Sequence, residues 1–382
     1  MAISSHVITF IVQGIEYSVS SFTISDGAFG TCFYFGTGFH GFVSNPFFFK
    51  YISGSVGSTY RYLNNYIKFN IIHNRFYYST KRQSKLSPYW VTGFADAEGS
   101  FSLKLAKKST SISGWSVIPA FSIELHSQDT QLIREIHSFF GVGIVSERKD
   151  RNIIVYSVQS YRDIINAIIP HFDKFPLISQ KKADYLLFKR GVELLSLKAK
   201  SIEGIREIIS LKASMNTGLS ETLKTEFPTV LPVPRPLVCF QGIPDPNWLA
   251  GFVDGEGCFY VKVRKNNAYL CGYQVIISFS ISQHARDEAL LAKLIDYLGC
   301  GMIEKVSTRP SGATFVVYKF NDVYDKIIPF FQKFPLHGVK SMDCRDFSAI
   351  GELIKNKSHI TLEGLKKIRS LKSGMNTGRT YN

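Results

Sequence analysis

The sequence has few cysteines, and they are not arranged in any pattern that binds a metal. No CxxC pair and no Cys/His cluster occurs in the 382 residues, so a zinc finger is not expected. Scattered cysteines in a chain of this size are typical of a reducing compartment. The six cysteines are Cys32, Cys239, Cys258, Cys271, Cys300 and Cys344.

Lysine and arginine are absent from the first 49 positions. That segment holds two acids, so the other residues carry a charge of +17, given +15 for the whole chain. A charge of this size favours a polyanionic partner, either nucleic acid or an acidic membrane surface. The basic n-region of a signal peptide is also absent. Residues 27–49 are uncharged, but five glycines and Pro46 make them poor material for a membrane-spanning helix.

One long segment of the chain occurs twice. "WVTGFADAEGSFSL" from Trp90 matches "WLAGFVDGEGCFYV" from Trp248 at an offset of 158 residues. The match continues with "FSIELHSQDTQLI" on "FSISQHARDEALL", then "KFPLISQK" on "KFPLHGVK" at offset 159, and "IEGIREIISLKASMNTG" on "LEGLKKIRSLKSGMNTG" at offset 160. Two one-residue shifts over so long a stretch indicate duplication of a whole domain, and the period excludes short solenoid repeats.

The segments outside the duplication differ from it in composition. Between the copies, "EFPTVLPVPRPLVCFQGIPDPN" holds six of the 14 prolines, which predicts an extended linker. Residues 50–85, rich in Tyr, Asn, Lys and Arg, predict a basic, loosely structured lead-in. We therefore expect a lead-in over 42–85, one domain over 86–220, a linker over 221–246 and a second domain over 247–382.

Within each copy the hydrophobic pattern predicts an α+β unit. A short helix covers the motif, and an alternating strand follows, with Phe101, Leu103 and Leu105 on one face and Ser102 and Lys104 on the other. The predicted order is helix, two strands, helix, two strands, helices. Helices then cover one face of an antiparallel sheet, and the free face is polar and basic.

Small residues four positions apart mark one face of each motif helix. Gly93 and Ala97 form one such pair, and Gly251 and Gly255 form the other. Small side chains at this spacing let two helix backbones approach closely, which predicts that the two motif helices pack on each other.

The glutamates that end the motif helices, Glu98 and Glu256, would then meet at the interface. Two adjacent carboxylates repel unless a divalent cation lies between them, and oxygen ligands suit Mg²⁺. A metal beside a basic sheet surface is what phosphodiester hydrolysis requires. The alternative for one motif is a solvated helix end before a glycine cap, but two copies with the same acid spacing favour the metal site.

Two lysines and two histidines also recur in the copies. Lys181 and Lys340 lie five residues after the proline of each "KFPL" and could stabilise charge on a phosphate; ordinary surface lysines at a helix start are the alternative. His126 and His284 are better explained as structural residues at a strand end than as catalysts.

The segments "TGFADAEGSF" and "AGFVDGEGCF" resemble the two motifs of single-chain LAGLIDADG homing endonucleases, and the likeness covers about residues 88–380. The resemblance implies two tandem αββαββα domains related by a pseudo-twofold axis, with saddle-shaped antiparallel sheets and packed motif helices. It implies cleavage of both strands of double-stranded DNA across the minor groove, by hydrolysis that depends on Mg²⁺ or Mn²⁺, while the sheets lie in the major groove.

The resemblance also implies roles for individual residues. Glu98 and Glu256 would be metal ligands, together with the backbone carbonyls of Ala97 and Gly255. Lys181 and Lys340 would be active-site lysines. The helix interface would be held by Gly93, Asp96, Gly251 and Asp254. Bases would be read by Ser102, Lys104, Lys107, Tyr260, Lys262 and Arg264, and phosphates bound by Arg148, Lys149, Arg151 and Arg309.

The segment "IEYSVSSFTISDGAFGTCFYFGTGFHG", which ends at Gly41, resembles part of cytochrome c oxidase subunit 3. An intron reading frame continuous with an upstream exon would produce this join. Residues 1–41 would then be an exon-derived segment without a role in cleavage. The resemblance implies mitochondrial coding, a place in the mitochondrial matrix, and a target in the subunit 3 gene.

Two other functions are open on the same fold. One is a maturase that binds its host intron RNA and assists splicing, and the other is a DNA-binding regulator without nuclease activity. Two retained acidic motifs favour cleavage. A chain that carries both halves of the site is expected to act as a monomer without an obligate protein partner.

Overall fold

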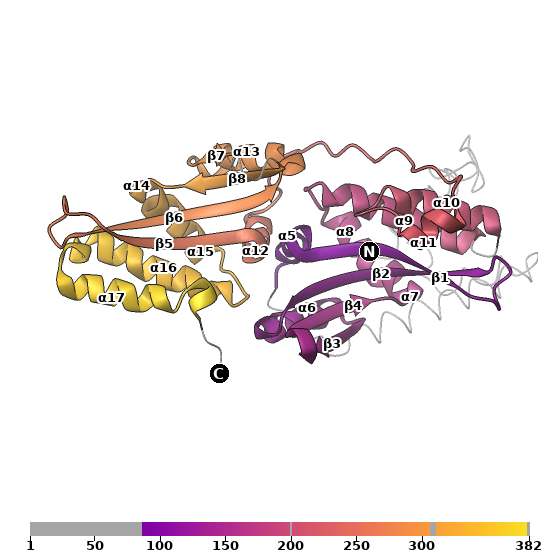
Figure 1. The fold of residues 1–382 in the computed structure, drawn as a ribbon, viewed down its shortest axis with the longest axis horizontal. Helices are drawn as coiled ribbons and strands as arrows, with labels where there is room; N and C mark the ends of the chain where they lie inside the picture. Colours follow the sequence, from indigo (N-terminus) through magenta and orange to yellow (C-terminus); the bar gives the residue numbers. More distant parts are fainter. Residues whose placement is uncertain (1–85, 199–200, 306–310, 380–382) are drawn as a thin grey trace, which may run out of the picture. The chain divides into compact units, whose positions relative to one another are not determined.

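The computed structural model of the protein describes residues 86–198, 201–305 and 311–379, which form two copies of one α+β unit (Figure 1). The expected exon-derived segment 1–41, the lead-in 42–85 and Arg309 lie outside the described residues. No helix among the described residues is long and apolar enough to cross a membrane.

The first copy starts with the motif helix and ends with a series of helical elements after its fourth strand. Its first six elements are α5 (Pro88–Glu98), β1 (Gly99–Lys107), β2 (Trp115–His126), α6 (Thr130–Phe140), β3 (Ile144–Arg148) and β4 (Ile153–Val158). A short 3₁₀ turn, η2 (Ser127–Asp129), precedes α6. The remaining elements are α7 (Tyr161–Asp163), the π-helical turn η4 (Ile164–Ile168), α8 (Ile169–Lys174), α9 (Lys181–Lys198), α10 (Ile202–Ala213) and α11 (Glu221–Glu226).

The second copy repeats this order without a counterpart of α11 among the described residues. It consists of α12 (Pro246–Glu256), β5 (Gly257–Lys265), β6 (Tyr273–His284), the 3₁₀ turn η5 (Ala285–Asp287), α13 (Glu288–Leu298), β7 (Met302–Glu304) and β8 (Gly312–Val317). Helical elements follow: α14 (Phe320–Asp322), η6 (Val323–Ile327), α15 (Ile328–Lys333), α16 (Lys340–Lys355), the turn η7 (Ser358–Ile360) and α17 (Leu362–Ser373).

Each copy contains one antiparallel four-stranded sheet, with strand orders β1-β2-β4-β3 and β5-β6-β8-β7. The two registers correspond, because Phe101 lies opposite Phe121 and Phe259 opposite Phe279. Buried and exposed residues alternate along β1 and β5, so helices cover only one face of each sheet. The predicted α+β fold is therefore confirmed.

Each motif helix leads directly into the first strand of its sheet. Pro88 and Pro246 occupy the first helical positions, where the missing N–H costs nothing. The helices end at Gly99 and Gly257, where the backbone becomes extended. A Cβ on Gly99 would lie 2.6 Å from the carbonyl oxygen of Ala95, so only glycine fits this tight change of direction.

Aromatic rings fill the layer between sheet and helices in both copies. Phe101 of β1 has its ring centroid 5.0 Å from Phe121 and 5.5 Å from Phe188 of α9. The corresponding Phe259 lies 5.3 Å from both Phe279 and Phe347 of α16. All of these rings are fully buried, so each sheet is fixed to its lysine-bearing helix by a large apolar contact.

The linker starts later than expected and is attached to the first copy. Residues 221–226 form α11 because Ser220 caps the helix by accepting from the N–H of Leu223. The extended part then runs along α10, where the Ser214 hydroxyl donates to the Val233 carbonyl at 2.5 Å. Arg235 forms two 2.8 Å bonds to the carboxylate of Asp184 in α9. The linker is thus extended, as its prolines predict, but it is not a free tether.

Candidate active site

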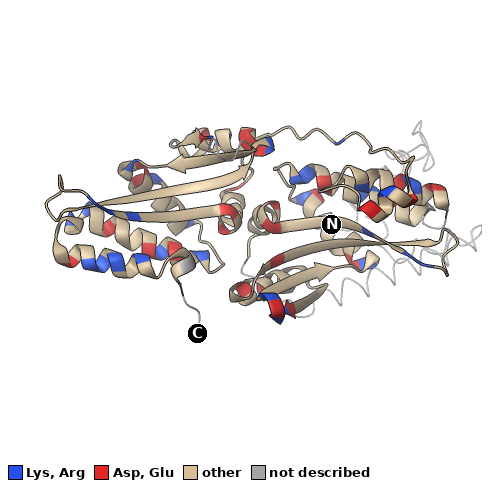
Figure 2. Cartoon of the chain, in the orientation of Figure 1, with Lys and Arg blue, Asp and Glu red and all other residues tan. Residues whose placement is uncertain are grey.

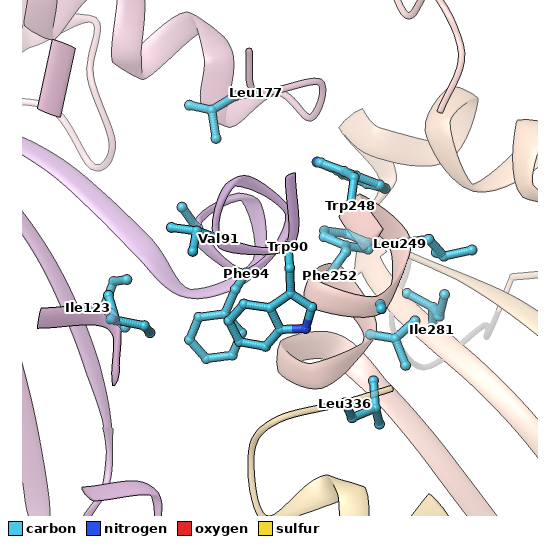
Figure 3. Packing of buried hydrophobic residues seen from close by; sticks show 14 of the residues in the cluster. Trp90, Val91, Phe94, Ile123, Leu177, Trp248, Leu249, Phe252, Ile281 and Leu336 are labelled. Atoms are coloured by element: carbon cyan, nitrogen blue, oxygen red, sulfur yellow. The ribbon is translucent and has the colours of Figure 1, made fainter. Parts of the chain in front are cut away.

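The two motif helices, α5 and α12, cross at their glycines. A Cβ on Gly93 would lie 1.9 Å from the backbone oxygen of Trp248, and one on Gly251 would lie 2.0 Å from that of Trp90. Figure 3 shows Trp90 and Phe94 of α5 beside Trp248 and Phe252 of α12. The prediction that the motif helices pack on each other through small residues is confirmed.

The glutamates at the ends of these helices are close together. A Cβ on Gly255 would lie 2.4 Å from the Cβ of Ala97 and 3.3 Å from Oε1 of Glu98, so the two helix ends adjoin. Figure 2 shows acidic residues at the adjoining ends of α5 and α12. Burial raises the pKa of both Glu98 and Glu256, and the charge of Glu98 adds to the rise at Glu256.

A lysine from each copy reaches the end of its own motif helix. Lys181, at the start of α9, donates from Nζ to the carbonyl of Ala97 at 2.9 Å. Lys340, at the start of α16, donates to the carbonyl of Gly255 at 2.5 Å. Burial lowers the pKa of both lysines, and the nearby carboxylates counter that effect. Neither lysine is exposed, so the alternative of ordinary surface lysines at a helix start is not supported.

The two motif aspartates hold the loops that lead to these lysines. Asp96 accepts from the N–H groups of Ile178 and Ser179 and, at 2.6 Å, from the Ser179 hydroxyl. It also accepts from Nε1 of Trp248 at 2.8 Å, across the helix interface. Burial raises the pKa of Asp96.

In the second copy, Asp254 accepts from the N–H groups of His337 and Gly338 at 2.6 and 2.8 Å. Burial raises the pKa of Asp254 to about 6. Both aspartates therefore support the lysine loop of their own copy, and Asp96 alone also bonds across the interface.

The oxygen atoms at the helix ends fit a hard divalent cation. Glu98 and Glu256 directly follow Ala97 and Gly255 in the chain, at helix ends that adjoin, and the carbonyls of Ala97 and Gly255 accept from the two lysines. No group of three or more His, Cys, Asp or Glu that could hold a metal occurs among the described residues. This set suits Mg²⁺, which takes one or two carboxylates and fills its other positions with water and phosphate oxygens.

The predicted base-reading side chains lie on the uncovered face or at the edge of each sheet. Lys104, Tyr260, Lys262 and Arg264 are exposed and Ser102 is half-buried. Arg264 is oriented by a 2.8 Å bond to the Gln274 amide.

Lys107 differs from the other predicted base readers, because it forms an ion pair with Glu226 of α11 and lies over the ring of Trp115. Nothing corresponding holds Lys265, its counterpart in β5, among the described residues.

The predicted phosphate contacts cluster between β3 and β4. Lys149 and Arg151 are exposed, and Arg148 forms a 3.2 Å ion pair with Glu124. The turn of Lys149–Arg151 ends at Asn152, which has a left-handed backbone with φ of 53°.

The histidines have the structural role that the sequence favours. Nδ1 of His126 accepts from the N–H of Gln128, and Nδ1 of His284 accepts from that of Arg286. Each imidazole thus caps a turn that follows a strand.

The repeated "MNTG" contains a pair of residues that the sequence did not identify. Asn216 has φ of 46°, donates from its backbone to Asp184 and donates from its side chain to the Phe101 carbonyl at 2.9 Å. Asn376 repeats both bonds with Asp343 and Phe259. These asparagines tie the end of the last long helix to the first strand, and the repetition of the motif was the signal for them.

Two further aspartates, Asp129 and Asp287, bond to the loop of the opposite copy and were not singled out from the sequence. Oδ1 of Asp129 accepts from the N–H of Val339 at 2.8 Å, and Oδ1 of Asp287 from that of Gln180 at 2.7 Å. Their matched positions in "HSQD" and "HARD" were the available signal.

Comparison with known proteins identifies two families in the chain. A family model described as LAGLIDADG endonuclease matches residues 91–192 and 249–350. A model described as cytochrome c oxidase subunit III matches residues 1–54, which extends beyond Gly41, where the likeness was expected to end. The cytochrome c oxidase subunit 3 of Pyricularia grisea is 97% identical to this chain over 29 residues.

Among relatives, the "Probable intron-encoded endonuclease 3" of Neurospora crassa is 37% identical over 290 residues, which cover 75% of this chain. The chain spans 54% of that relative's length, and 65% of that of "Probable intron-encoded endonuclease 2" from the same organism.

Among solved structures, I-SmaMI bound to an uncleaved DNA target in the presence of calcium ions is 44% identical, with a TM-score of 0.75. The similarity covers 77% of this chain and 100% of that one. I-SmaMI has also been solved bound to cleaved DNA. A double variant of it carries lysine-to-alanine changes 159 positions apart, the same separation as Lys181 and Lys340 here.

Proposed function

The chain belongs to the LAGLIDADG endonuclease family, and we propose that it cuts both strands of a specific DNA site by metal-dependent hydrolysis of phosphodiester bonds. The observation that carries this proposal is the pair of glutamates, Glu98 and Glu256, at adjoining ends of interlocked helices. A half-buried lysine of the same copy bonds to the carbonyl just before each glutamate and interacts electrostatically with it. The site is thus two equivalent halves, as two strand cuts require.

Glu98, Glu256 and the carbonyls of Ala97 and Gly255 would hold Mg²⁺ or Mn²⁺. When bound, the metal supplies an activated water and stabilises the leaving oxygen. Lys181 and Lys340 hold a positive charge beside these oxygens, where it favours the ionised glutamates and the added charge of a reacting phosphate. The lysine spacing shared with the I-SmaMI double variant supports this assignment.

The uncovered sheet faces would bind DNA, with Lys104, Lys262 and Arg264 placed to reach base edges in the major groove. Lys149 and Arg151 would contact phosphates from the turn between β3 and β4. The chain's net charge of +15 supports a large phosphate contribution, so affinity should fall steeply as salt rises.

The target we propose is a mitochondrial cytochrome c oxidase subunit 3 gene, since the start of the chain matches that subunit. The protein would then act as a monomer in the mitochondrial matrix, where it would promote homing of its own intron. Host intron RNA is the second candidate partner, and its binding should be tested separately. Both glutamates and both lysines are present at the helix ends, which supports cleavage. No observation favours splicing over cleavage.

The test is a cleavage assay with the purified chain, Mg²⁺ and an intron-free subunit 3 gene. We expect a double-strand cut near the exon junction, and its loss when EDTA removes the metal. Glu98→Gln or Glu256→Gln should abolish double-strand cleavage yet leave binding measurable by mobility shift. Glu363→Gln, at an exposed acid of α17, is the matched control and should cut normally. Cleavage by both motif variants would refute the metal assignment.

The proposed irrelevance of residues 1–85 to cleavage is tested separately. A chain that begins near Ser84 should cut the same DNA as fast as the full chain. A loss of activity on truncation would contradict the idea that residues 1–85 have no role in cleavage.

A further inference from the structure

Asp129 and Asp287 occupy helix N-caps but do not cap their own helices. Asp129 precedes α6 and Asp287 precedes α13, and neither side chain accepts from an N–H of the helix that it begins. An N-cap aspartate ordinarily accepts from the second or third N–H of its helix. The same departure in both copies indicates that these carboxylates are committed elsewhere.

Each carboxylate bonds to the residue just before the active-site lysine of the opposite copy. Asp129 accepts from Val339, which precedes Lys340 at the start of α16. Asp287 accepts from Gln180, which precedes Lys181 at the start of α9. A carboxylate at this end of a helix satisfies a free N–H and matches the positive end of the helix dipole.

The surroundings show that both contacts are built into the fold. The Asp287 residue is only 5% exposed. A Cβ on Gly338 would lie 3.1 Å from Oδ1 of Asp129, so the loop before Lys340 approaches this carboxylate closely because glycine is there. Each aspartate also interacts electrostatically with the active-site lysine of the opposite copy. Asp129 attracts Lys340, and Asp287 attracts Lys181.

We propose that Asp129 and Asp287 are positioning residues, each of which sets the active-site lysine of the other copy. Lys340 would be held by its own loop and by the first copy, and Lys181 by its own loop and by the second. Neither half of the site would be complete until the two copies dock. This inference rests on the proposed function, in which the two lysines serve the cutting of two strands.

The test is a strand-resolved cleavage assay under single-turnover conditions, with each DNA strand labelled separately. Asp129→Ala should slow the strand that Lys340→Ala slows, by about tenfold or more, although Asp129 lies in the first copy. Combined with Lys340→Ala it should slow that strand no further, whereas its effect should multiply with that of Lys181→Ala. Asp287→Ala should show the reverse pattern. Asparagine, which can still accept from the N–H, should restore part of the rate at either position.

Two controls separate positioning from a general loss of stability. Thr361→Ala removes a threonine that does cap its own helix, α17, and should lower the melting temperature without favouring either strand. Equal slowing of both strands by Asp129→Ala, or slowing of the strand that Lys181→Ala slows, would overturn the proposal.

Hydrogen exchange gives a readout that does not depend on cleavage. Asp129→Ala should increase amide exchange in the loop before Lys340 and leave the loop before Lys181 protected, and Asp287→Ala should do the opposite. Unchanged exchange in both loops would also overturn the proposal. Failure of the wild-type chain to cut DNA would refute the proposed function, and the exchange pattern would still decide this inference.

Discussion

The two copies hold the same reactive groups with different hydrogen bonds. In the first copy, the carboxylate of Asp96 accepts from Nε1 of Trp248 at 2.8 Å. In the second, Oδ1 of Asp254 and Nε1 of Trp90 are both buried, and the described residues offer no hydrogen-bond partner to either atom. The interface is therefore symmetric in its backbone contact and asymmetric in its polar contacts.

The loops before the two lysines differ as well. Ser179 donates its hydroxyl to Asp96, whereas the second copy has Gly338 at that position. Trp90 packs edge-on against the ring of His337, with centroids 5.1 Å apart, where the first copy has Ile178. Glutamate, lysine and lysine-bound carbonyl are retained in both copies, whereas the residues around them differ.

The largest effect is expected where the copies are most alike. Gly93→Ala and Gly251→Ala would each place a Cβ about 2 Å from a backbone oxygen of the facing helix, and a backbone cannot move aside as a side chain can. Each change should cost about 4 kcal/mol or more in the free energy of unfolding, as overpacking at a helix crossing that cannot relax. Urea denaturation measures this cost. A loss in only one of the two variants would contradict the symmetric backbone contact.

The motif aspartates should separate the copies. Asp96→Ala leaves donors from Ile178, Ser179 and Trp248 without an acceptor, so we expect a loss of about 3–5 kcal/mol in the free energy of unfolding. Asp254→Ala frees two backbone N–H groups and removes a carboxylate whose burial raises its pKa, so about 1–3 kcal/mol is expected. Equal losses in thermal or urea unfolding would show that the asymmetric hydrogen bonds do not contribute to stability.

The sequence predicted those parts of the molecule that depend on local periodicity or on repetition. Phe101 and Leu103 alternate with polar neighbours, and this alternation is enough to place β1 and its buried face. Gly93 and Gly251 predicted the helix crossing because small side chains at matched positions let two helix backbones approach closely. The proximity of the helix ends that carry Glu98 and Glu256 followed from that crossing.

The hydrogen bonds of Asp129 and Asp287 to the opposite copy were not predicted. Nothing local distinguishes Asp129 from an ordinary N-cap, and its partner Val339 lies 210 residues away in the chain. Helix α11 lies in the segment expected to be linker and was not predicted, and the Lys107–Glu226 pair depends on it. Such contacts join segments whose patterns are individually unremarkable, so periodicity carries no information about them.

The small residues next to the glutamates, Ala97 and Gly255, can be exchanged between the two copies. Gly255 faces Ala97, and a Cβ on Gly255 would lie 2.4 Å from the Ala97 methyl group. Gly255→Ala alone should cost about 1–3 kcal/mol through overpacking. The exchange Ala97→Gly with Gly255→Ala should recover most of that loss in urea unfolding. If the exchange recovered no stability, each copy would require its own residue. The space around Ala97 would then differ from the space around Gly255.

The last prediction concerns the tryptophans, where the effect is a difference between two variants, and it tests the unequal hydrogen bonds directly. Trp248→Phe removes the Nε1 donor to Asp96, while Trp90→Phe removes an Nε1 that has no acceptor among the described residues. Both changes delete a similar ring volume at a fully buried position, so the packing losses should nearly cancel in the comparison. The difference should then approach the contribution of one hydrogen bond to a charged group, about 1.5–3 kcal/mol, with Trp248→Phe the less stable. Because Asp96 keeps its bonds to the Lys181 loop, this loss should appear in unfolding measurements more than in the rate of strand cleavage. If Trp90→Phe proved as costly as Trp248→Phe, Nε1 of Trp90 must have a partner, such as an ordered water, and the two halves of the interface would be equally satisfied.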